Sequence, residues 1–142
     1  MNTSVLLKSS AVLWIIWGLV HVFFGIMIII GDTGSGIQAI GNGVELTQIN
    51  YPDVLGAIMN QHGWNLLWFG VVTTVGAVFI WRGSNIAIGI NAMIAGLGDL
   101  GYFMFLDLGG YVKFLPGTLM TIIALTAILL SFGAYFKYKS SN

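Results

Sequence analysis

Four long apolar runs constrain this chain more than any other feature of its sequence. They cover residues 11–30, 62–81, 85–106 and 117–135. A helix needs roughly 20 apolar residues to cross the hydrocarbon core of a bilayer, and each run has that length. Only 7% of the residues are charged, whereas about a quarter are charged in a soluble domain. The sequence therefore predicts an all-α integral membrane protein, a single domain over residues 1–142 with four transmembrane helices in up-down-up-down order.

Charge and cysteine content exclude several classes of function. The five basic and five acidic residues cancel, so nucleic acid is not an expected partner. Cysteine is absent, which excludes disulfides, thiolate metal sites and a cysteine nucleophile. The first apolar run follows Lys8 as a secretory signal would, but it is too long and lacks a small-residue cleavage site after it. We therefore interpret it as a retained transmembrane helix.

The basic residues predict how the bundle is oriented. Lys8, Arg82, Lys137 and Lys139 fall on one side of the predicted bundle, and only Lys113 falls on the other. Lysine and arginine accumulate in the cytoplasmic loops of membrane proteins. We therefore expect a multi-pass protein of the plasma (inner) membrane, with its N- and C-termini in the cytoplasm and the loop 31–61 outside.

The outer loop, residues 31–61, divides into two halves. The first half is rich in glycine and predicts a flexible segment. The second half has Asn50 as a candidate N-cap and Pro52 near the first helical position. It predicts either a second helix that starts before the membrane or a short interfacial helix across the outer mouth. A loop of this length can act as a lid, and the alternative is a mobile or partner-contacting loop.

Helical spacing places the polar residues of the runs on defined faces. In the third run, Asp99 and Tyr102 share a face with several small residues. In the first run, His21 lies between Gly18 and Gly25 on one face. Small residues mark helix–helix contacts in membranes. These polar groups are therefore predicted to point into the bundle.

Asp99 and His21 are the candidate catalytic residues. His21 lies about 13 Å and Asp99 about 10 Å below the outer boundary, so the two can meet near the midplane. An aspartate there costs about 2.5–3.5 kcal/mol on insertion scales, and an ionisable residue at that depth is a functional candidate by default. A carboxyl–imidazole pair in a dry pocket is suited to proton transfer. The alternatives are structural: an aspartic acid that joins two helices by one hydrogen bond, and a histidine satisfied in the core.

Five further residues are candidates for substrate binding, because they lie toward the outer end of the same polar path. They are Gln61, His62, Trp64, Asn65 and Tyr102. We expect a pocket for a lipophilic small molecule, reached from the outer leaflet. Isomerisation or cyclisation of an isoprenoid-like compound would suit this site, since neither reaction needs a metal, a nucleotide or another cofactor. The alternative is a non-catalytic accessory or structural subunit, as a homo-oligomer or within a larger membrane complex.

Two histidines in a four-helix membrane bundle also raise the question of a b-type haem. His21 lies near the middle of the bilayer and His62 near its surface, roughly 12 Å apart in depth. Axial ligands have to reach one iron from opposite faces, so this separation disfavours haem. A metal site formed by His21, His62 and Asp99 meets the same difficulty and has no recognisable ligand spacing.

Two stretches of the sequence carry a resemblance to a known family. The chain has four spans in 142 residues, with "WGLVHVFFG" in the first run and "QHGWNLLWFG" at the start of the second. In these features it resembles the small bacterial DoxX-like membrane proteins. The likeness lies in size, span layout and glycine–aromatic texture, and it covers most of the chain. It implies a four-helix fold and, as for some members, a role as a subunit of a quinone-linked oxidoreductase. A looser likeness to four-helix sterol-isomerase-type proteins transfers no catalytic residue, because the spans contain no glutamate.

Overall fold

The computed structural model describes residues 2–41 and 50–139, and this part of the chain is helical without any strand. The long helices are α1 (Thr3–Ile30), α3 (Asp53–Trp81), α4 (Asn85–Tyr102) and α5 (Leu119–Lys139). Three shorter helical segments connect them: α2 (Thr33–Ile40), the π-helical η1 (Phe103–Asp107) that continues α4, and the π-helical η2 (Phe114–Thr118) that leads into α5.

Four helical segments are long and apolar enough to cross a membrane, as expected of a multi-pass membrane protein. They are Thr3–Ile30, Asp53–Trp81, Asn85–Asp107 and Phe114–Lys139. Each of them contains one of the four apolar runs, so the prediction of an all-helical chain with four candidate membrane spans is confirmed.

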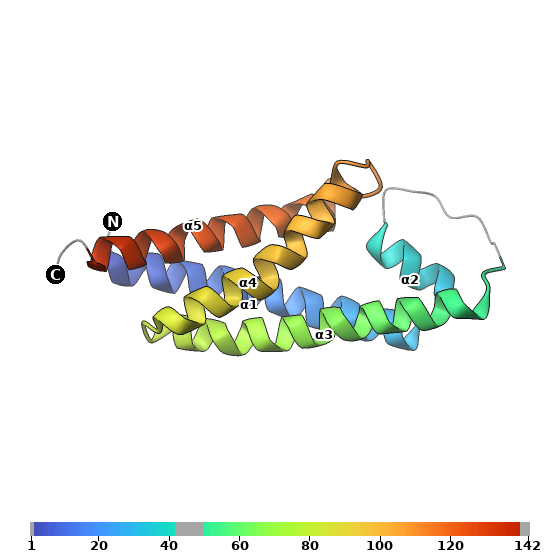
Figure 1. Ribbon diagram of the computed structural model, residues 1–142, viewed down its shortest axis with the longest axis horizontal. Helices are drawn as coiled ribbons and strands as arrows, with labels where there is room; N and C mark the ends of the chain where they lie inside the picture. The colour runs from blue at the N-terminus through green and yellow to red at the C-terminus, as the bar shows by residue number, and fades with distance from the viewer. Residues whose placement is uncertain (1, 42–49, 140–142) are drawn as a thin grey trace.

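The helices form an elongated bundle (Figure 1). The start of α1, the end of α5 and the turn between α3 and α4 lie at one end, and the turn between α1 and α2 lies at the other. A side-chain contact supports this placement, because Lys8 Nζ of α1 lies 5.4 Å from the ring centroid of Trp81 at the end of α3. Two of the basic residues used to predict the orientation, Lys8 and Arg82, are therefore at the same end of the bundle.

Short polar side chains and one glycine define the helix ends. The carboxylate of Asp32 accepts a hydrogen bond from the Ser35 amide at 2.7 Å, which caps α2 and holds the pKa of Asp32 below its usual range. The hydroxyl of Ser84 accepts from the Ala87 amide at 3.3 Å and caps α4. Between α3 and α4, Gly83 adopts a φ of +87°, which favours glycine, and the chain reverses there.

Helices α1 and α3 make the closest contact of the bundle through two pairs of glycines. Gly18 of α1 faces Gly70 of α3: a Cβ on Gly18 would lie 2.7 Å from the Gly70 carbonyl oxygen. One heptad along, Gly25 faces Gly63, and a Cβ on Gly25 would lie 2.7 Å from the Gly63 carbonyl oxygen. No side chain fits in either place, so the two backbones touch directly. The sequence-based assignment of Gly18 and Gly25 to a helix–helix contact is confirmed.

Helix α4 is tied to α3 near their connecting turn and then moves away from it. Asn91 Nδ2 donates a hydrogen bond to the Thr73 carbonyl oxygen at 3.0 Å, and both residues are fully buried. The amide of Asn91 lies against Gly76, where a Cβ would collide with Asn91 Oδ1. Beyond this point α4 crosses from α3 toward α5 (Figure 1), so the bundle is tight near the turn and opens toward the opposite end.

The structure corrects two details of the predicted outer loop. Its glycine-rich half was predicted to be flexible, but Thr33–Ile40 forms helix α2, because Asp32 caps this segment. The N-cap of α3 is Pro52, not Asn50, and the helix begins at Asp53, ahead of the predicted span. Residues 42–49 of the loop lie outside the described residues.

Candidate functional site

Three side chains from α1 and α4 form one connected group in the middle of the bundle. Trp17 Nε1 donates a hydrogen bond to Asp99 Oδ2 at 2.8 Å. The Nδ1 of His21 lies 2.8 Å from the carbonyl oxygen of Trp17, and the indole and imidazole rings stack with their centroids 3.5 Å apart. Trp17 therefore contacts both candidate catalytic residues, through its indole N–H on one side and through its carbonyl and ring on the other.

This geometry fixes the hydrogen-bonding role of each atom. A carbonyl oxygen only accepts, so His21 Nδ1 carries the hydrogen of that bond and, in the neutral ring, Nε2 is left with a lone pair. The carboxyl of Asp99 is 6% exposed and uses Oδ2 for the bond to Trp17. Its Oδ1 has no hydrogen-bond partner among the described residues. One acceptor of His21 and one oxygen of Asp99 are thus available to a bound molecule.

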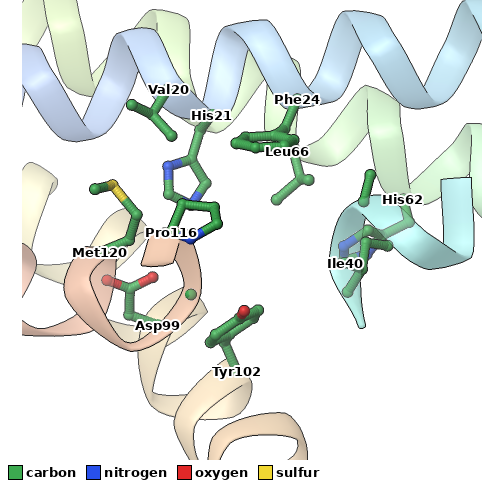
Figure 2. Close-up of a pocket in the computed structure, with 12 residues that line it drawn as sticks. Val20, His21, Phe24, Ile40, His62, Leu66, Asp99, Tyr102, Pro116 and Met120 are labelled. Carbon is green, nitrogen blue, oxygen red and sulfur yellow. The ribbon is translucent and has the colours of Figure 1, made fainter. Parts of the chain in front are cut away.

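His21 and Asp99 line a cavity of about 70 Å³ that reaches from the middle of the bundle toward α2. Figure 2 shows His21 extending from α1 and Asp99 from α4 into the same space, with Tyr102 one turn further along α4. His62 of α3 and Ile40 of α2 line its outer part. Helix α2 therefore lies at the outer part of this cavity.

The segment η2 closes the cavity on the side of α5. Pro116 and Gly117 of η2 and Met120 at the start of α5 contribute to its wall. Gly117 is needed for the close approach of Tyr102, because a Cβ at Gly117 would lie 2.6 Å from the Tyr102 hydroxyl oxygen. The phenol of Tyr102 is therefore held against η2, with its hydroxyl at the cavity wall.

Two larger cavities meet the first one at Asp99. A cavity of about 290 Å³ lies between α1, α3 and α4 and also includes His21, His62 and Tyr102 in its wall. A second one, of about 220 Å³, lies between α4 and α5. Small-molecule sites have volumes of about 300–1,000 Å³, and the cavity between α1, α3 and α4 is near the lower end of this range. Asp99 is common to all three walls.

The structure brings four of the seven predicted site residues together and separates the other three. His21, His62, Asp99 and Tyr102 line the same cavity. Gln61 and Trp64 are exposed on α3, with Trp64 59% exposed. The side-chain oxygen of Asn65 accepts a hydrogen bond from Trp68 Nε1 at 3.3 Å. None of these three residues lines the three cavities described above.

Sequence reasoning missed the role of Trp17. It expected Asp99 and His21 to meet directly, whereas the hydrogen bonds described for both residues go to Trp17. The available signal was the spacing: Trp17 precedes His21 by four positions, which places both on one helical face.

The wall of the site carries little charge. It combines one carboxyl, two imidazoles, one phenol, one indole and one threonine hydroxyl with apolar side chains, and no lysine or arginine of the described residues lines the three cavities. Within residues 2–41 and 50–139, no group of three or more histidine, cysteine or acidic residues is placed to hold a metal ion. The chemistry on offer from these side chains is hydrogen bonding and proton transfer.

Comparison of the chain with protein-family models, curated proteins and solved structures finds no match. The resemblance to DoxX-like proteins therefore stays an expectation from the sequence.

Proposed function

We propose that this chain crosses the plasma membrane four times, as an up-down-up-down bundle, and binds a lipophilic small molecule between α1, α3 and α4. The observation that supports this most is a pair of polar atoms without partners at one cavity. Asp99 Oδ1 has no hydrogen-bond partner among the described residues, and the hydrogen bond of His21 Nδ1 leaves Nε2 as an acceptor. Both residues line the cavity, so a molecule bound there can form hydrogen bonds with both atoms.

The reaction proposed for this site is acid–base isomerisation or cyclisation of an isoprenoid-like compound. In an isomerisation, Asp99 in its acid form gives the proton of Oδ1 to one alkene carbon, whose π electrons form the new C–H bond. His21 Nε2 removes a proton from a neighbouring carbon, and the electrons of that C–H bond form the new double bond. The proton returns from His21 to Asp99 before the next turnover. Tyr102 and His62 orient the molecule.

Substitution of Asp99 tests this proposal. Asp99→Asn keeps the shape of the side chain and an oxygen that accepts from Trp17, but removes the proton that is transferred. We expect a folded protein without activity, since general acid–base groups typically contribute about 10²–10⁴-fold to a rate. The measurement compares the lipophilic compounds in membranes of cells that express the wild type or the variant. The wild type should change the ratio of an isomer pair, and Asp99→Asn should leave it as in cells without the protein.

Asp107→Asn is the matched control. The Asp107 carboxyl accepts a hydrogen bond from Thr118 at 2.7 Å and does not line the three cavities. It should therefore keep the wild-type ratio of isomers. If Asp99→Asn is as active as Asp107→Asn, the proton of Asp99 has no chemical role and the enzymatic proposal is wrong.

The alternative function is that of an accessory or structural subunit, and one observation favours it. The hydrogen bond from Trp17 to Asp99 joins α1 to α4, so the carboxyl also holds the bundle together. On this alternative, Asp99→Asn is neutral and Asp99→Leu destabilises the bundle. Native mass spectrometry in mild detergent would then detect a homo-oligomer or a larger membrane complex. A monomer that keeps its activity would exclude the accessory role.

The orientation proposed for the bundle places both termini in the cytoplasm and α2 outside, so that the ligand arrives from the outer leaflet. The chain has no cysteine, so single cysteines can be introduced without background labelling. Ser35→Cys in α2 and Ser84→Cys in the α3–α4 turn should be labelled from opposite sides of the membrane. Labelling of both from the same side would contradict the proposed topology.

A further inference from the structure

We infer that the molecule bound at Asp99 is a long-chain alcohol whose hydrocarbon chain lies between α4 and α5. This inference rests on the proposed function and extends it to the class of ligand. The region concerned is the second of the larger cavities, which we call the α4–α5 groove. Its wall includes Gly96, Leu100, Phe103, Thr121, Leu125 and Ile128, together with Asp99 at one end.

The first argument is the position of Asp99, which lines both the α4–α5 groove and the cavity that contains His21 and Tyr102. A molecule whose polar end is bound at Asp99 can therefore place its hydrocarbon chain in the groove. Among the described residues of its wall, Thr121 is the only polar side chain besides Asp99, and its hydroxyl oxygen is buried without a hydrogen-bond partner in this part of the chain. The groove therefore suits hydrocarbon along most of its length.

The second argument is the way in which the groove is made and opened. Gly96 packs closely against Ile128 in the wall of the groove, since a Cβ there would lie 2.9 Å from Ile128 Cδ1. Leu100 is 51% and Leu125 57% exposed, so the groove faces the surroundings of the bundle along its side. In a bilayer this side faces the lipid chains, and a hydrocarbon chain can enter laterally without crossing water.

The third argument concerns the polar end of the ligand. No lysine or arginine lines the groove or the cavity within the described part of the chain, so nothing there neutralises a carboxylate or a phosphate. A charged group buried without a partner is far more costly than a hydroxyl that is hydrogen-bonded. A hydroxyl can accept from the Oδ1–H of Asp99 in its acid form and donate to His21 Nε2. The site therefore favours an uncharged alcohol over a fatty acid or a phospholipid.

Photolabelling tests the inference with two probes that differ only in their polar end. The probes are hexadecanol and hexadecanoic acid, each with a diazirine in the middle of the chain, added to the protein in lipid nanodiscs. Mass spectrometry then locates the labelled residues. We expect hexadecanol to label the groove at Leu100 and Leu125, and unlabelled hexadecanol to compete. The acid should label those positions no more than it labels Leu97 and Leu129, which are 63% and 64% exposed.

Gly96→Leu fills the groove without changing any polar group of the cavity. We expect it to reduce groove labelling by hexadecanol about tenfold, because an added side chain of this size overpacks the space that the chain would occupy. Gly89→Leu is the matched control, since it lies on the same helix and a Cβ there meets nothing within 4 Å. Hexadecanol should label the groove of this control variant as strongly as that of the wild type. Thermal unfolding of both variants shows that each is folded.

The possible outcomes separate this inference from the proposed function. Two outcomes would leave the proposed site intact but place the hydrocarbon chain of the ligand elsewhere. In the first, hexadecanol labels Tyr102 and Met120 in the cavity but no residue of the groove. In the second, hexadecanol labels the Gly96→Leu and Gly89→Leu variants equally. If hexadecanoic acid labels the groove as strongly as hexadecanol, the alcohol selectivity is wrong. A further outcome concerns a folded Asp99→Leu variant. If hexadecanol labels its cavity and groove as it labels those of the wild type, Asp99 does not bind the polar end of the ligand, and the proposed site itself is wrong.

Discussion

The α1–α3 interface and the α4–α5 groove both depend on glycine, with opposite results. In the interface, Gly18 and Gly25 face Gly70 and Gly63, so backbone meets backbone and no space is left. In the groove, Gly96 faces the end of the Ile128 side chain, and a cavity of about 220 Å³ lies beside it. In the interface, small residues of both helices let the backbones touch. At Gly96 the contact is with the end of one side chain, and the two helices leave a cavity beside it.

The buried polar side chains also differ between the closely packed part of the bundle and its open side. Near the turn between α3 and α4, Asn91 Nδ2 donates to the Thr73 carbonyl oxygen. Its Oδ1 has no hydrogen-bond partner among the described residues, but it is packed against Gly76 and lines none of the three cavities. Two turns further along α4, Asp99 has one oxygen bonded to Trp17 and the other free at a cavity. The buried amide holds helices together, whereas the buried carboxyl does so only in part. The free oxygen is what makes the open side of the bundle a candidate site.

The largest effect should come from filling the closed interface. Gly70→Leu places a side chain where the Gly18 carbonyl and Val22 already lie, and the two helices have to separate. We expect a loss of about 3 kcal/mol in the free energy of unfolding, at the upper end of typical overpacking costs. Unfolding in detergent measures it. Gly133→Leu, where a Cβ meets nothing within 4 Å, is the control. Equal stability of the two variants would contradict the direct backbone contact.

A smaller effect is expected at the tie between α3 and α4. Asn91→Ala removes the hydrogen bond to Thr73 and should cost about 1–2 kcal/mol, in the upper range for interhelical polar contacts in membranes. Asn65→Ala is the same substitution at a partly exposed position of α3, where the amide bonds only to the nearby Trp68. It should change the stability by much less. A larger loss for Asn65→Ala would show that the polar contacts of α3 are ranked wrongly.

The smallest effect on stability, but a large one on function, is expected for Trp17→Phe. This change keeps an aromatic ring next to His21 and removes the N–H that holds Asp99 Oδ2. It should cost about 1 kcal/mol of stability and lower the conversion of the bound compound. Trp14→Phe is the matched control, because Trp14 Nε1 is buried without a hydrogen-bond partner. If both variants behave alike, the indole of Trp17 does not position Asp99.

The sequence was sufficient for those parts of the structure that one helix determines alone. Helical periodicity gave the faces that carry His21, Asp99 and Tyr102, and the glycines of α1 gave its contact surface. Periodicity fixes no crossing angle between two helices, because tilt depends on packing against neighbours. The groove beside Gly96 and the bond between Trp17 and Asp99 both depend on where α4 crosses the bundle. They could be found only once the helices were placed together.

An experimental structure of the protein extracted with its surrounding lipid into polymer nanodiscs tests the central claim most directly. The claim is that the open side of the bundle holds a molecule whose polar end is bound by Asp99. We expect elongated density that is not protein, with one end within hydrogen-bonding distance of Asp99 Oδ1 and the other between α4 and α5. A bundle in which α4 packs against its neighbours without a cavity, with Asp99 bonded only to Trp17, would contradict it.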